Sequence, residues 1–405
     1  MVRKRFTWLA VILTFALIAG ACGDSSDDTT TTTAADAATT QAPTTTAAPA
    51  TTAAPETTAA PDTTEAPMAA GEGYKVAFIY DGFQIDGGWN EAHEIGRRAI
   101  EDAFPGIETT FVEEIPPGAT AQAAMDDFAA DGYDMIIGTT FYMFDAMEVA
   151  PLYPDVIFLT WGGVGLLDNM GQYDGASEDG RYLDGLIAGS MVSEGATIGY
   201  VGGFPIEEVN RAANAFTIGV REVNPTATVE LVFINSWWDP PVEQQATQAL
   251  IDAGVEAVSH ELNSAAVPST AEAAGVYISG YGFDASANAP TKWLSSFVWN
   301  WGAYYVDQVQ AMIDGNWEAA QFYGGLEDNM ITMSSFGPDV PQDVIDLVNS
   351  RMAELTAGTF DIFAGPILDN EGNEIVPAGG TIAKADRPGC CLWLIEGIEG
   401  EIPAG

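Results

Sequence analysis

Residues 75–103 read KVAFIYDGFQIDGGWNEAHEIGRRAIEDA. The stretch opens with the short apolar run Lys75 to Tyr80, whose length and aromatic and β-branched residues predict a buried strand. It closes with Glu91 to Ala103, where apolar residues recur at helical spacing. A buried strand followed by a helix is the repeating unit of parallel sheets that are covered by helices. The stretch therefore predicts an α/β fold.

The same alternation continues along the chain. The predicted strands are Lys75 to Tyr80, Thr109 to Glu114, Asp134 to Gly138, Val156 to Trp161, Thr197 to Gly202, Thr228 to Ile234, Val255 to Leu262 and Val276 to Tyr281. The predicted helices are Glu91 to Ala103, Thr120 to Ala130, Met143 to Tyr153, Arg181 to Glu194, Glu207 to Val223, Val242 to Ala253 and Ser269 to Ala274. The series breaks near Gly195, so we expect two doubly wound lobes.

Two later segments predict how the lobes are joined. Trp301 to Asp314 is expected to be a helix that returns to the first lobe, and Pro341 to Ala357 a helix near the end of the chain. We assign residues 71–195 and part of 300–405 to lobe 1, and residues 196–299 to lobe 2. Several crossings between the lobes would form a hinge. Because ligands of such sheets lie outside the carboxyl ends of the strands, we expect the ligand in a cleft between the lobes.

The beginning of the chain has the layout of an export signal. Arg3, Lys4 and Arg5 precede an apolar run that is shorter than the roughly 20 residues of a membrane-spanning helix. We therefore expect residues 1–21 to be removed. The sequence AGAC at residues 19–22 resembles the lipobox of bacterial lipoproteins, in which the cysteine takes up acyl chains. This resemblance makes Cys22 a lipid anchor, while an alanine in place of the commoner leucine leaves a secreted product open.

Residues 22–70 are predicted to be a disordered linker. From Ser25 to Ala70 the chain is almost entirely Thr, Ala, Pro and acidic residues, with no aromatic side chain. Such a segment cannot bury enough apolar surface to offset its conformational entropy. A flexible chain of this length reaches roughly 40 Å, and further where proline extends it. The linker would hold the folded part of the chain, residues 71–405, away from the membrane.

The charge balance excludes several classes of partner. The chain has 13 Lys and Arg against 58 Asp and Glu, a formal net charge of −45. Too few cations exist to neutralise the phosphates of a nucleic acid, so we expect no nucleic-acid partner. Anionic ligands are disfavoured for the same reason. A generally acidic surface that keeps the protein in solution by self-repulsion is the expected consequence.

The cysteines and histidines predict neither a metal site nor a disulfide framework. Apart from Cys22, the chain has only the adjacent Cys390 and Cys391, which form either a vicinal disulfide or two free thiols. His93 and His260 lie far apart in the sequence, without the clusters that bind zinc. We expect no cofactor. No nucleophile elbow of the Gly-x-Ser-x-Gly type is present either.

The loop of residues 81–90 is the first candidate for contact with a ligand. It begins at Asp81, directly after the first predicted strand, and ends with Trp89 and Asn90 at the start of a helix. The loop is rich in glycine, but the GxGxxG pattern and the lysine of a phosphate-binding loop are absent. An aromatic ring and an amide at a helix start are better suited to stacking on a flat ligand and bonding its edge.

Two further candidates follow strands of the second lobe. Trp237 and Trp238 are adjacent in a loop, where they either pack as a structural corner or face a ligand. A base held between aromatic faces gains about 1–3 kcal/mol per stack. Asp284 follows the strand that ends at Tyr281, where it either accepts hydrogen bonds from a ligand or serves as a loop or cap carboxylate.

From Tyr74 to Gly400 the sequence resembles the basic membrane protein family of substrate-binding lipoproteins, which includes purine nucleoside receptors of ABC uptake systems. The resemblance rests on motifs that occur in the family's order and spacing rather than on any single motif. They are DGGWN at 86–90, Asp145 with Val149-Ala150 and YPD at 153–155, YLDG at 182–185, AG at 188–189, IGYV at 198–201, Arg211, AF at 215–216, Gly219, NP at 224–225, WDP at 238–240, Gly280 with Asp284, GNW at 315–317, and EG at 396–397 with Gly400.

The resemblance implies the fold of a type I periplasmic binding protein and a set of ligand contacts. It places Trp89 on one face of a base and Trp237 on the other. It places Asn90 and Asp145 at the edge of the base, and Asp284 near the ring or the ribose. The family's lysine in the region of Trp299 and Asn300 has no match here. Since that lysine serves the polar end of a nucleoside, its loss favours a free base or another flat heterocycle.

We therefore predict a binding protein rather than an enzyme. It would be a monomer on the extracytoplasmic face of the cell membrane, held there by its lipid anchor, binding a purine nucleoside or nucleobase and presenting it to the permease and ATPase of an ABC transporter. A hinge between the lobes would close on the ligand. The alternatives are a surface receptor that signals through a partner, and a hydrolase of nucleosides or sugars that uses paired carboxylates such as Asp81 and Asp86.

Overall fold

A computed structural model describes residues 69–163 and 165–403. The expected signal segment, Cys22 and nearly all of the expected linker lie outside these residues. In the described part of the chain, no helix is long and apolar enough to cross a membrane.

The first lobe is built on a six-stranded sheet in which every neighbouring pair of strands is parallel. The strand order is β11-β5-β4-β3-β1-β2. The strands are β1 (Lys75–Ile79), β2 (Glu108–Val112), β3 (Met135–Gly138), β4 (Ile157–Trp161), β5 (Met170–Gly175) and β11 (Gln321–Gly324). Four of them were predicted from the sequence, whereas β5 and β11 were not.

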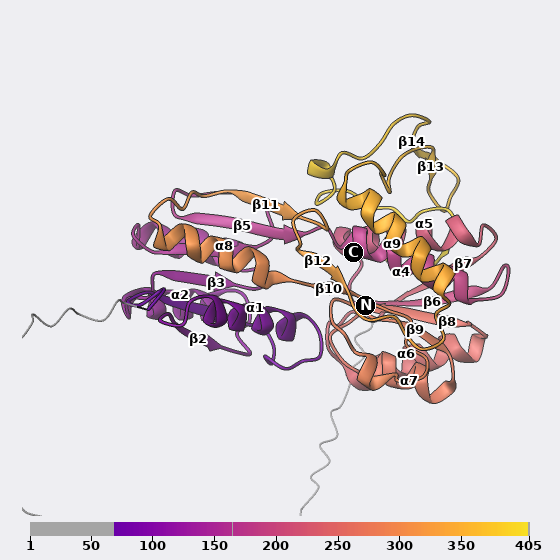
Figure 1. Cartoon of the computed structure of the whole chain (residues 1–405), viewed down its shortest axis with the longest axis horizontal. Coiled ribbons are helices and arrows are strands. Elements are labelled where there is room, and N and C mark those ends of the chain that lie inside the picture. The colour runs from indigo at the N-terminus through magenta and orange to yellow at the C-terminus, as the bar shows by residue number, and fades with distance from the viewer. Residues whose placement is uncertain (1–68, 164, 404–405) are drawn as a thin grey trace, which may run out of the picture. The chain divides into compact units, whose positions relative to one another are not determined.

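Helices cover both faces of this sheet. They are α1 (Trp89–Ala103), α2 (Ala119–Ala130), α3 (Met143–Val149) with the short η1 (Ala150–Leu152), and α8 (Trp301–Ile313). Alternate residues of β1 face opposite ways, as in any strand: Val76 and Phe78 join the large core that includes α1 and α8, while Ala77 and Ile79 pack toward α2 and α3. Helix α8 packs against α1, so the predicted return to the first lobe is found (Figure 1).

The second lobe has a five-stranded parallel sheet in the order β15-β7-β6-β8-β9. The strands are β6 (Thr197–Gly202), β7 (Thr228–Phe233), β8 (Ala257–Glu261), β9 (Tyr277–Ser279) and β15 (Ile398–Glu399). The helices of this lobe are α4 (Ser177–Met191), α5 (Glu207–Val223), α6 (Pro240–Ala253), α7 (Ala266–Ala274), η2 (Ser286–Asn288) and α9 (Gln342–Thr356). The predicted α/β fold with two parallel sheets is thus confirmed.

The chain leaves the first lobe earlier than the break predicted near Gly195. Helix α4 packs against α5 and α9 rather than on the first sheet, so the crossing lies between Gly175 and Ser177. Glycines make this packing close. A Cβ atom on Gly185 would lie 2.0 Å from the carbonyl oxygen of Phe216, and one on Gly219 2.1 Å from that of Tyr182. Helix α4 therefore belongs to the second lobe, because its backbone lies directly against that of α5.

Two further crossings complete the connection between the lobes. The chain returns to the first lobe where β10 (Phe297–Trp299) leads into α8, and leaves it again between β11 and β12 (Ile331–Met333). Strands β10 and β12 form an antiparallel pair. The connection thus consists of three backbone segments, which is the arrangement expected of a hinge.

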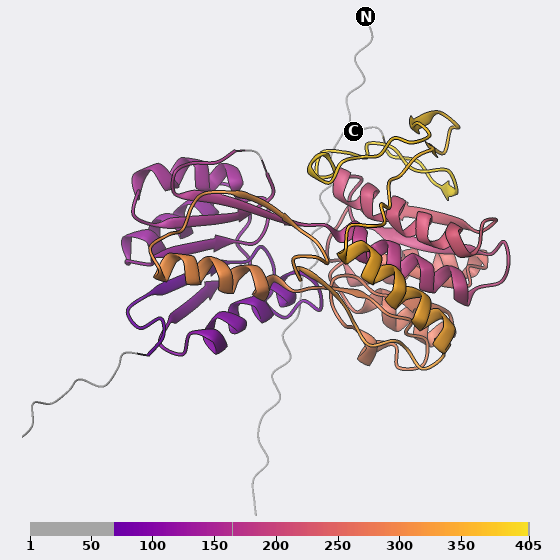
Figure 2. The ribbon, with the colours of Figure 1, turned by 45° about the horizontal axis from the view of Figure 1, so that its top comes forward.

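The C-terminal part of the chain lies on the second lobe (Figure 2). It contains the hairpin of β13 (Ile367–Leu368) and β14 (Glu374–Val376) and the short η3 (Lys384–Asp386). The side chain of Asn214, in α5, donates to the carbonyl oxygen of Trp393 at 3.0 Å and accepts from the backbone N–H of Ile395 at 2.8 Å. The adjacent Cys390 and Cys391 form a disulfide, which settles the alternative left open by the sequence.

Candidate functional site

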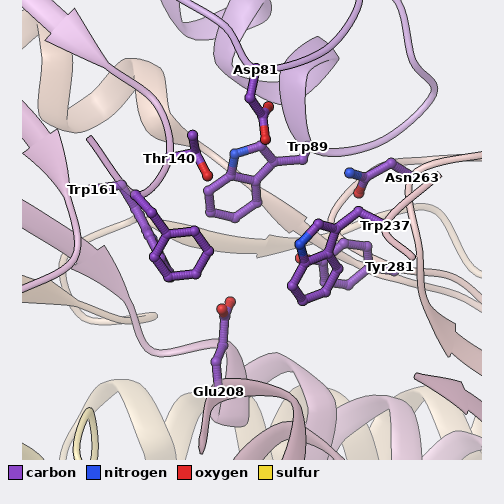
Figure 3. A pocket seen from close by; sticks show the side chains of 9 residues that line it. Asp81, Trp89, Thr140, Trp161, Glu208, Trp237, Asn263 and Tyr281 are labelled. Carbon is purple, nitrogen blue, oxygen red and sulfur yellow. The ribbon is translucent and has the colours of Figure 1, made fainter. Parts of the chain in front are cut away.

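A cavity of about 350 Å³ lies where the carboxyl ends of the two sheets face each other. Both lobes line it, and most of its residues lie at the end of a strand or within four residues after it. The lining residues are Asp81, Trp89, Thr140, Phe141 and Trp161 of the first lobe, and Glu208, Trp237, Asn263 and Tyr281 of the second. The carboxyl ends of parallel strands are where such sheets bind ligands, and Figure 3 shows these side chains converging on one space.

The first lobe contributes a wall of interlocked aromatic rings. The indole N–H of Trp89 donates to the carbonyl oxygen of Thr139 at 2.8 Å, and this fixes the ring at the start of α1. The ring meets Trp161 edge to face at 5.4 Å between centroids, and Trp301 in the same way at 5.4 Å. Trp161 in turn meets Phe141 at 4.9 Å. Trp89 is buried, so these contacts hold the wall in place before any ligand arrives.

The second lobe contributes Trp237 and Tyr281, which are supported differently. Trp237 is only partly buried and packs against Phe204 at 5.1 Å. Tyr281 lies over the fully buried guanidinium of Arg181, 5.2 Å from the ring centroid. That guanidinium also donates to the carbonyl oxygen of Gly280 at 2.8 Å. Arg181 therefore positions Tyr281 from behind, whereas Trp237 rests on Phe204 and on the backbone of Gly203, where a Cβ atom would lie 2.5 Å from its ring.

Two carboxyl groups face the cavity from opposite lobes. Burial raises the pKa of Asp81, although hydrogen bonds from the side chains of Asn90 and Thr140 partly offset that rise. Burial and the nearby Asp174 raise the pKa of Glu208 well above its ordinary value. Figure 3 shows Asp81 and Glu208 on opposite sides of the space that the tryptophans flank. A ligand with N–H or O–H groups on two edges would give both carboxylates the hydrogen bonds that water supplies elsewhere.

Asn90 lies behind the cavity rather than in its lining. Its side-chain amide donates to Asp86 at 3.0 Å, and the backbone N–H groups of Gly88 and Glu91 donate to the same carboxylate. Asp86 thus closes the first turn of α1 and holds the loop that carries Trp89. Burial raises the pKa of Asp86 to about 6. Asn90 reaches the site through its hydrogen bond to Asp81.

Two of the predicted contact residues lie elsewhere. Asp145 accepts from the backbone N–H of Gly118 and the side chain of Gln122, both at 2.9 Å, and so stabilises the start of α2. Asp284 is exposed and accepts from the backbone N–H of Ser286 at 3.0 Å, which is the role of a loop carboxylate. Neither residue lines the cavity, because each carboxylate is directed to backbone N–H groups of its own lobe.

Trp299 and Asn300, which occupy the region of the family's lysine, have structural roles. Trp299 is buried in the hinge, where its ring stacks on Trp301 at 4.6 Å. The side chain of Asn300 donates to the carbonyl oxygen of Asn329 at 2.8 Å. No lysine or arginine lines the cavity among residues 69–163 and 165–403. The same described residues contain no cluster of side chains that could hold a metal ion.

Six lining residues were not predicted from the sequence. They are Thr140, Phe141, Trp161, Glu208, Asn263 and Tyr281. Trp161 ends β4, the other four residues outside α5 lie two or three positions after the end of a strand, and Glu208 lies in the first turn of α5. Position near a strand end was therefore an available signal for five of the six residues, but not for Glu208.

The family model for the ABC transporter substrate-binding protein PnrA-like family matches residues 74–355. The chain belongs to this family. It is therefore a substrate-binding protein of an ABC transporter and not an enzyme, and its partners are a small-molecule ligand and the other subunits of the transporter.

Two relatives cover most of this binding protein and differ in their named ligands. A purine-binding protein of Brucella abortus is 35% identical over 338 residues, which are 82% of this chain and 95% of the relative. A protein of Haloferax volcanii, provisionally named an ABC transporter glucose-binding protein, is 35% identical over 335 residues, which are 82% of each chain.

Solved structures agree with the fold. A solute-binding protein from Conexibacter woesei superposes with a TM-score of 0.63 at 23% identity, covering 71% of this chain and 97% of that one. A solute-binding protein from Aeropyrum pernix gives a TM-score of 0.62 at 17% identity, covering 72% and 94%. Both confirm the architecture of a bilobed solute-binding protein.

Proposed function

We propose that this binding protein takes up a purine, as a free base or a nucleoside, in the cavity between its lobes. The observation that carries the proposal is the pair Trp161 and Trp237, which flank the space from opposite lobes (Figure 3). Flat rings gain about 1–3 kcal/mol per aromatic stack. A ligand held in this way would draw the two lobes together as it binds.

The two carboxyl groups support a ligand that donates hydrogen bonds. A purine presents ring N–H and amino groups at its edges, and Asp81 and Glu208 are acceptors when ionised. Thr140 and Asn263 add neutral polar contacts. The absence of lysine and arginine from the described lining disfavours nucleotides, because a phosphate would lie near two acids without a counter-charge.

The missing family lysine favours a base more than a nucleoside, because no cation of the described lining faces the polar end of a ribose. A monosaccharide is the second candidate, because hydroxyl groups also bind carboxylates and the Haloferax volcanii relative is named for glucose.

The experiment is a thermal-shift screen of the purified protein against nucleobases, nucleosides and sugars. A ligand that binds only the folded state raises the apparent melting temperature by mass action. We expect a shift with purines that disappears in Trp237→Ala and persists in Trp238→Ala, a matched control because Trp238 is the exposed neighbour in the same loop. A shift with glucose alone would transfer the proposal to the second candidate.

We also propose that the protein is a monomer held on the extracytoplasmic face of the membrane through Cys22. The support is the sequence pattern at residues 19–22. Mass spectrometry of the protein purified from membranes would detect the acylated N-terminal cysteine. A Cys22→Ser variant should appear in the culture medium or the envelope fluid, and unchanged membrane association of that variant would count against the anchor.

A further inference from the structure

A segment of the C-terminal part of the chain, residues 382–391, reaches the first crossing between the lobes and is called the hinge strap below. It lies beyond residues 74–355, which the family model matches. Arg387 of the strap is buried, and its guanidinium lies 3.4 Å from Glu178 and 3.9 Å from Asp179. Both acids belong to the first turn of α4, which begins where the chain has just left the first lobe. One cation of the strap is thus held at the first crossing.

The other cation of the strap, Lys384, is held at the third crossing. Its ammonium group forms an ion pair with Glu327 and lies 3.6 Å from Asp328. Both acids lie between β11 and β12. A Cβ atom on Gly325, in the same crossing, would lie 2.5 Å from Oδ2 of Asp179 and 3.3 Å from Nζ of Lys384. Acids from two crossings therefore surround one lysine beside a glycine of the hinge.

Hydrogen bonds join the same two crossings. The backbone N–H of Ala176 donates to the carbonyl oxygen of Gly324 at 2.8 Å, and that of Leu326 donates to Asp179 at 3.4 Å. The hydroxyl of Tyr323, in β11 of the first lobe, donates to Glu178 at 2.8 Å. The strap therefore adds its ion pairs to a junction at which the last strand of the first lobe meets the first helix of the second.

The charges around Lys384 are unequal, because three acids surround one cation. They are Asp179, Glu327 and Asp328. Carboxylates a few ångströms apart repel one another, and a cation between them offsets the repulsion. The side chain of Lys384 is 33% exposed, so water screens each pair and each is weak by itself. Without the lysine, repulsion would move the acids of the third crossing away from Asp179.

The hinge strap also borders the space next to the ligand cavity. Pro388 and Gly389 line a hollow that Gln321 lines from the first lobe. Trp161 and Glu208, from opposite lobes, line both this hollow and the ligand cavity. The strap contributes nothing to the described lining of the cavity itself. Its position can therefore affect the candidate site without any contact with a ligand.

We propose that the hinge strap sets the angle between the lobes of the ligand-free protein, and that Lys384 is the positioning residue through which it does so. The ion pairs of Lys384 hold the third crossing against the first. This keeps the two walls of the cavity at the separation that a ligand requires. The influence of Lys384 on binding passes through the hinge alone, so it does not depend on which compound the cavity accepts.

The test reverses the charge of Lys384 and compares the result with a matched reversal elsewhere. The control is Lys292→Glu, which breaks the 3.4 Å pair with Asp339 and changes the net charge by the same amount as Lys384→Glu. The distance between the lobes is measured without ligand by pulsed electron paramagnetic resonance. We expect Lys384→Glu to shift and broaden the distribution of distances, and Lys292→Glu to leave it as in the parent protein.

The spin labels are placed on one exposed side chain of each lobe. Leu152→Cys, in the short η1, labels the first lobe, and Gln248→Cys, in α6, labels the second. Both are introduced together with Cys22→Ser. The label pair is the same in the parent protein and in every variant, so any difference between distributions reports the substitution at the strap.

A charge swap separates the ion pairs from a merely structural role of the strap. Glu327→Lys added to Lys384→Glu restores an opposite pair at the net charge of the parent protein, and we expect it to restore the parent distribution. If the swap fails to do so, the charges are not what positions the crossing and the proposal is wrong. Should Lys384→Glu fail to fold, Lys384→Met against Lys292→Met gives the same comparison with a smaller shift.

Calorimetric titration with adenine and with glucose connects the hinge to binding. We expect Lys384→Glu to weaken binding of whichever compound the parent protein accepts, by roughly fivefold, and Lys292→Glu to leave it unchanged. A parent-like distance distribution or an undiminished affinity in Lys384→Glu would overturn the proposal. If the parent protein binds neither compound, the proposed ligands are wrong, and the distance distributions alone decide on the strap.

Discussion

The two walls of the cavity differ in how firmly their tryptophan side chains are held. In the first lobe, Trp89 is buried, hydrogen-bonded through its indole N–H and surrounded by Trp161, Trp299 and Trp301. In the second lobe, Trp237 is partly exposed and rests on Phe204 and the backbone of Gly203. One wall is fixed by the core of its lobe, and the other by a loop.

The two walls therefore contribute to ligand binding in different ways. A rigid wall loses little entropy when the ligand arrives, and so it sets the shape that is recognised. A loosely packed wall can adjust as the lobes close, at some entropic cost. We therefore expect substitutions in the first wall to change stability and affinity together, and substitutions in the second wall to change affinity alone.

The largest effect is expected for Trp89→Ala. Removing a buried tryptophan costs about 3–5 kcal/mol of unfolding free energy, because a cavity remains in the core. Urea unfolding without ligand would measure the loss. The exposed Trp238→Ala serves as the control, with a change within about 0.5 kcal/mol. If Trp89→Ala were as stable as that control, the aromatic contacts of Trp89 would not hold the first wall in place before the ligand binds.

Next in size is the effect of Trp237→Ala on affinity. Loss of one stack should weaken binding of the ligand by about 1–3 kcal/mol, roughly 5- to 150-fold. The unfolding free energy without ligand should change by less than about 1 kcal/mol. Isothermal titration calorimetry and urea unfolding give the two numbers. A large stability loss with intact affinity would reverse the contrast between the walls.

A smaller effect is expected from pH through Asp81. Burial raises the pKa of this carboxyl, so it takes up a proton at a higher pH than an ordinary aspartate. A ligand that donates a hydrogen bond needs the ionised form. Affinity is then complete above the raised pKa and falls about tenfold per pH unit below it. The affinity for the ligand would be measured between pH 5 and pH 8, and we expect it to fall less steeply on acidification in Asp81→Asn than in the parent protein. If the affinity instead rose on acidification, the protonated Asp81 carboxyl would be donating a hydrogen bond to the ligand.

The smallest effect is expected at the loop that supports Trp237. Asp239 accepts from the backbone N–H of Val242 at 3.3 Å and caps α6. Asp239→Ala should cost about 1 kcal/mol of stability and loosen the second wall, with an affinity loss of a few fold. Asp252→Ala, in the last turn of the same helix, is the control, because it removes an acidic group from the negative end of the helix dipole. If both variants lost affinity for the ligand equally, the cap at Asp239 would not be what supports Trp237.

The sequence was sufficient for most of the fold because the apolar patterning is strong. Thr197–Gly202 and Glu207–Val223 were predicted with the bounds that the structure has. The strand Met170–Gly175 was missed because Gln172 and Asp174 interrupt its apolar pattern, although Gln172 is buried. The lobe boundary was misplaced because helical periodicity does not say which sheet a helix covers. That choice depends on the close contact between α4 and α5.

The candidate site was less accessible to sequence reasoning. Asp81, Trp89 and Trp237 do line the cavity, since loops after parallel strands meet at one edge. Asp145 and Asp284 also lie near strand ends, but hydrogen bonds to local backbone groups direct their carboxylates elsewhere. Glu208 was missed because its burial depends on the packing of the other lobe. Residue type and position identify candidates, whereas side-chain direction is set by tertiary contacts.

The bond between Cys390 and Cys391 has a practical consequence. A disulfide stabilises a protein chiefly by closing a loop in the unfolded chain, and this one joins residues that are already neighbours. It encloses no folded segment, so it restricts the unfolded chain very little. The protein should accordingly fold when produced in a reducing host, and mild thiol treatment should alter the turn at these two residues while leaving the melting of both lobes unchanged.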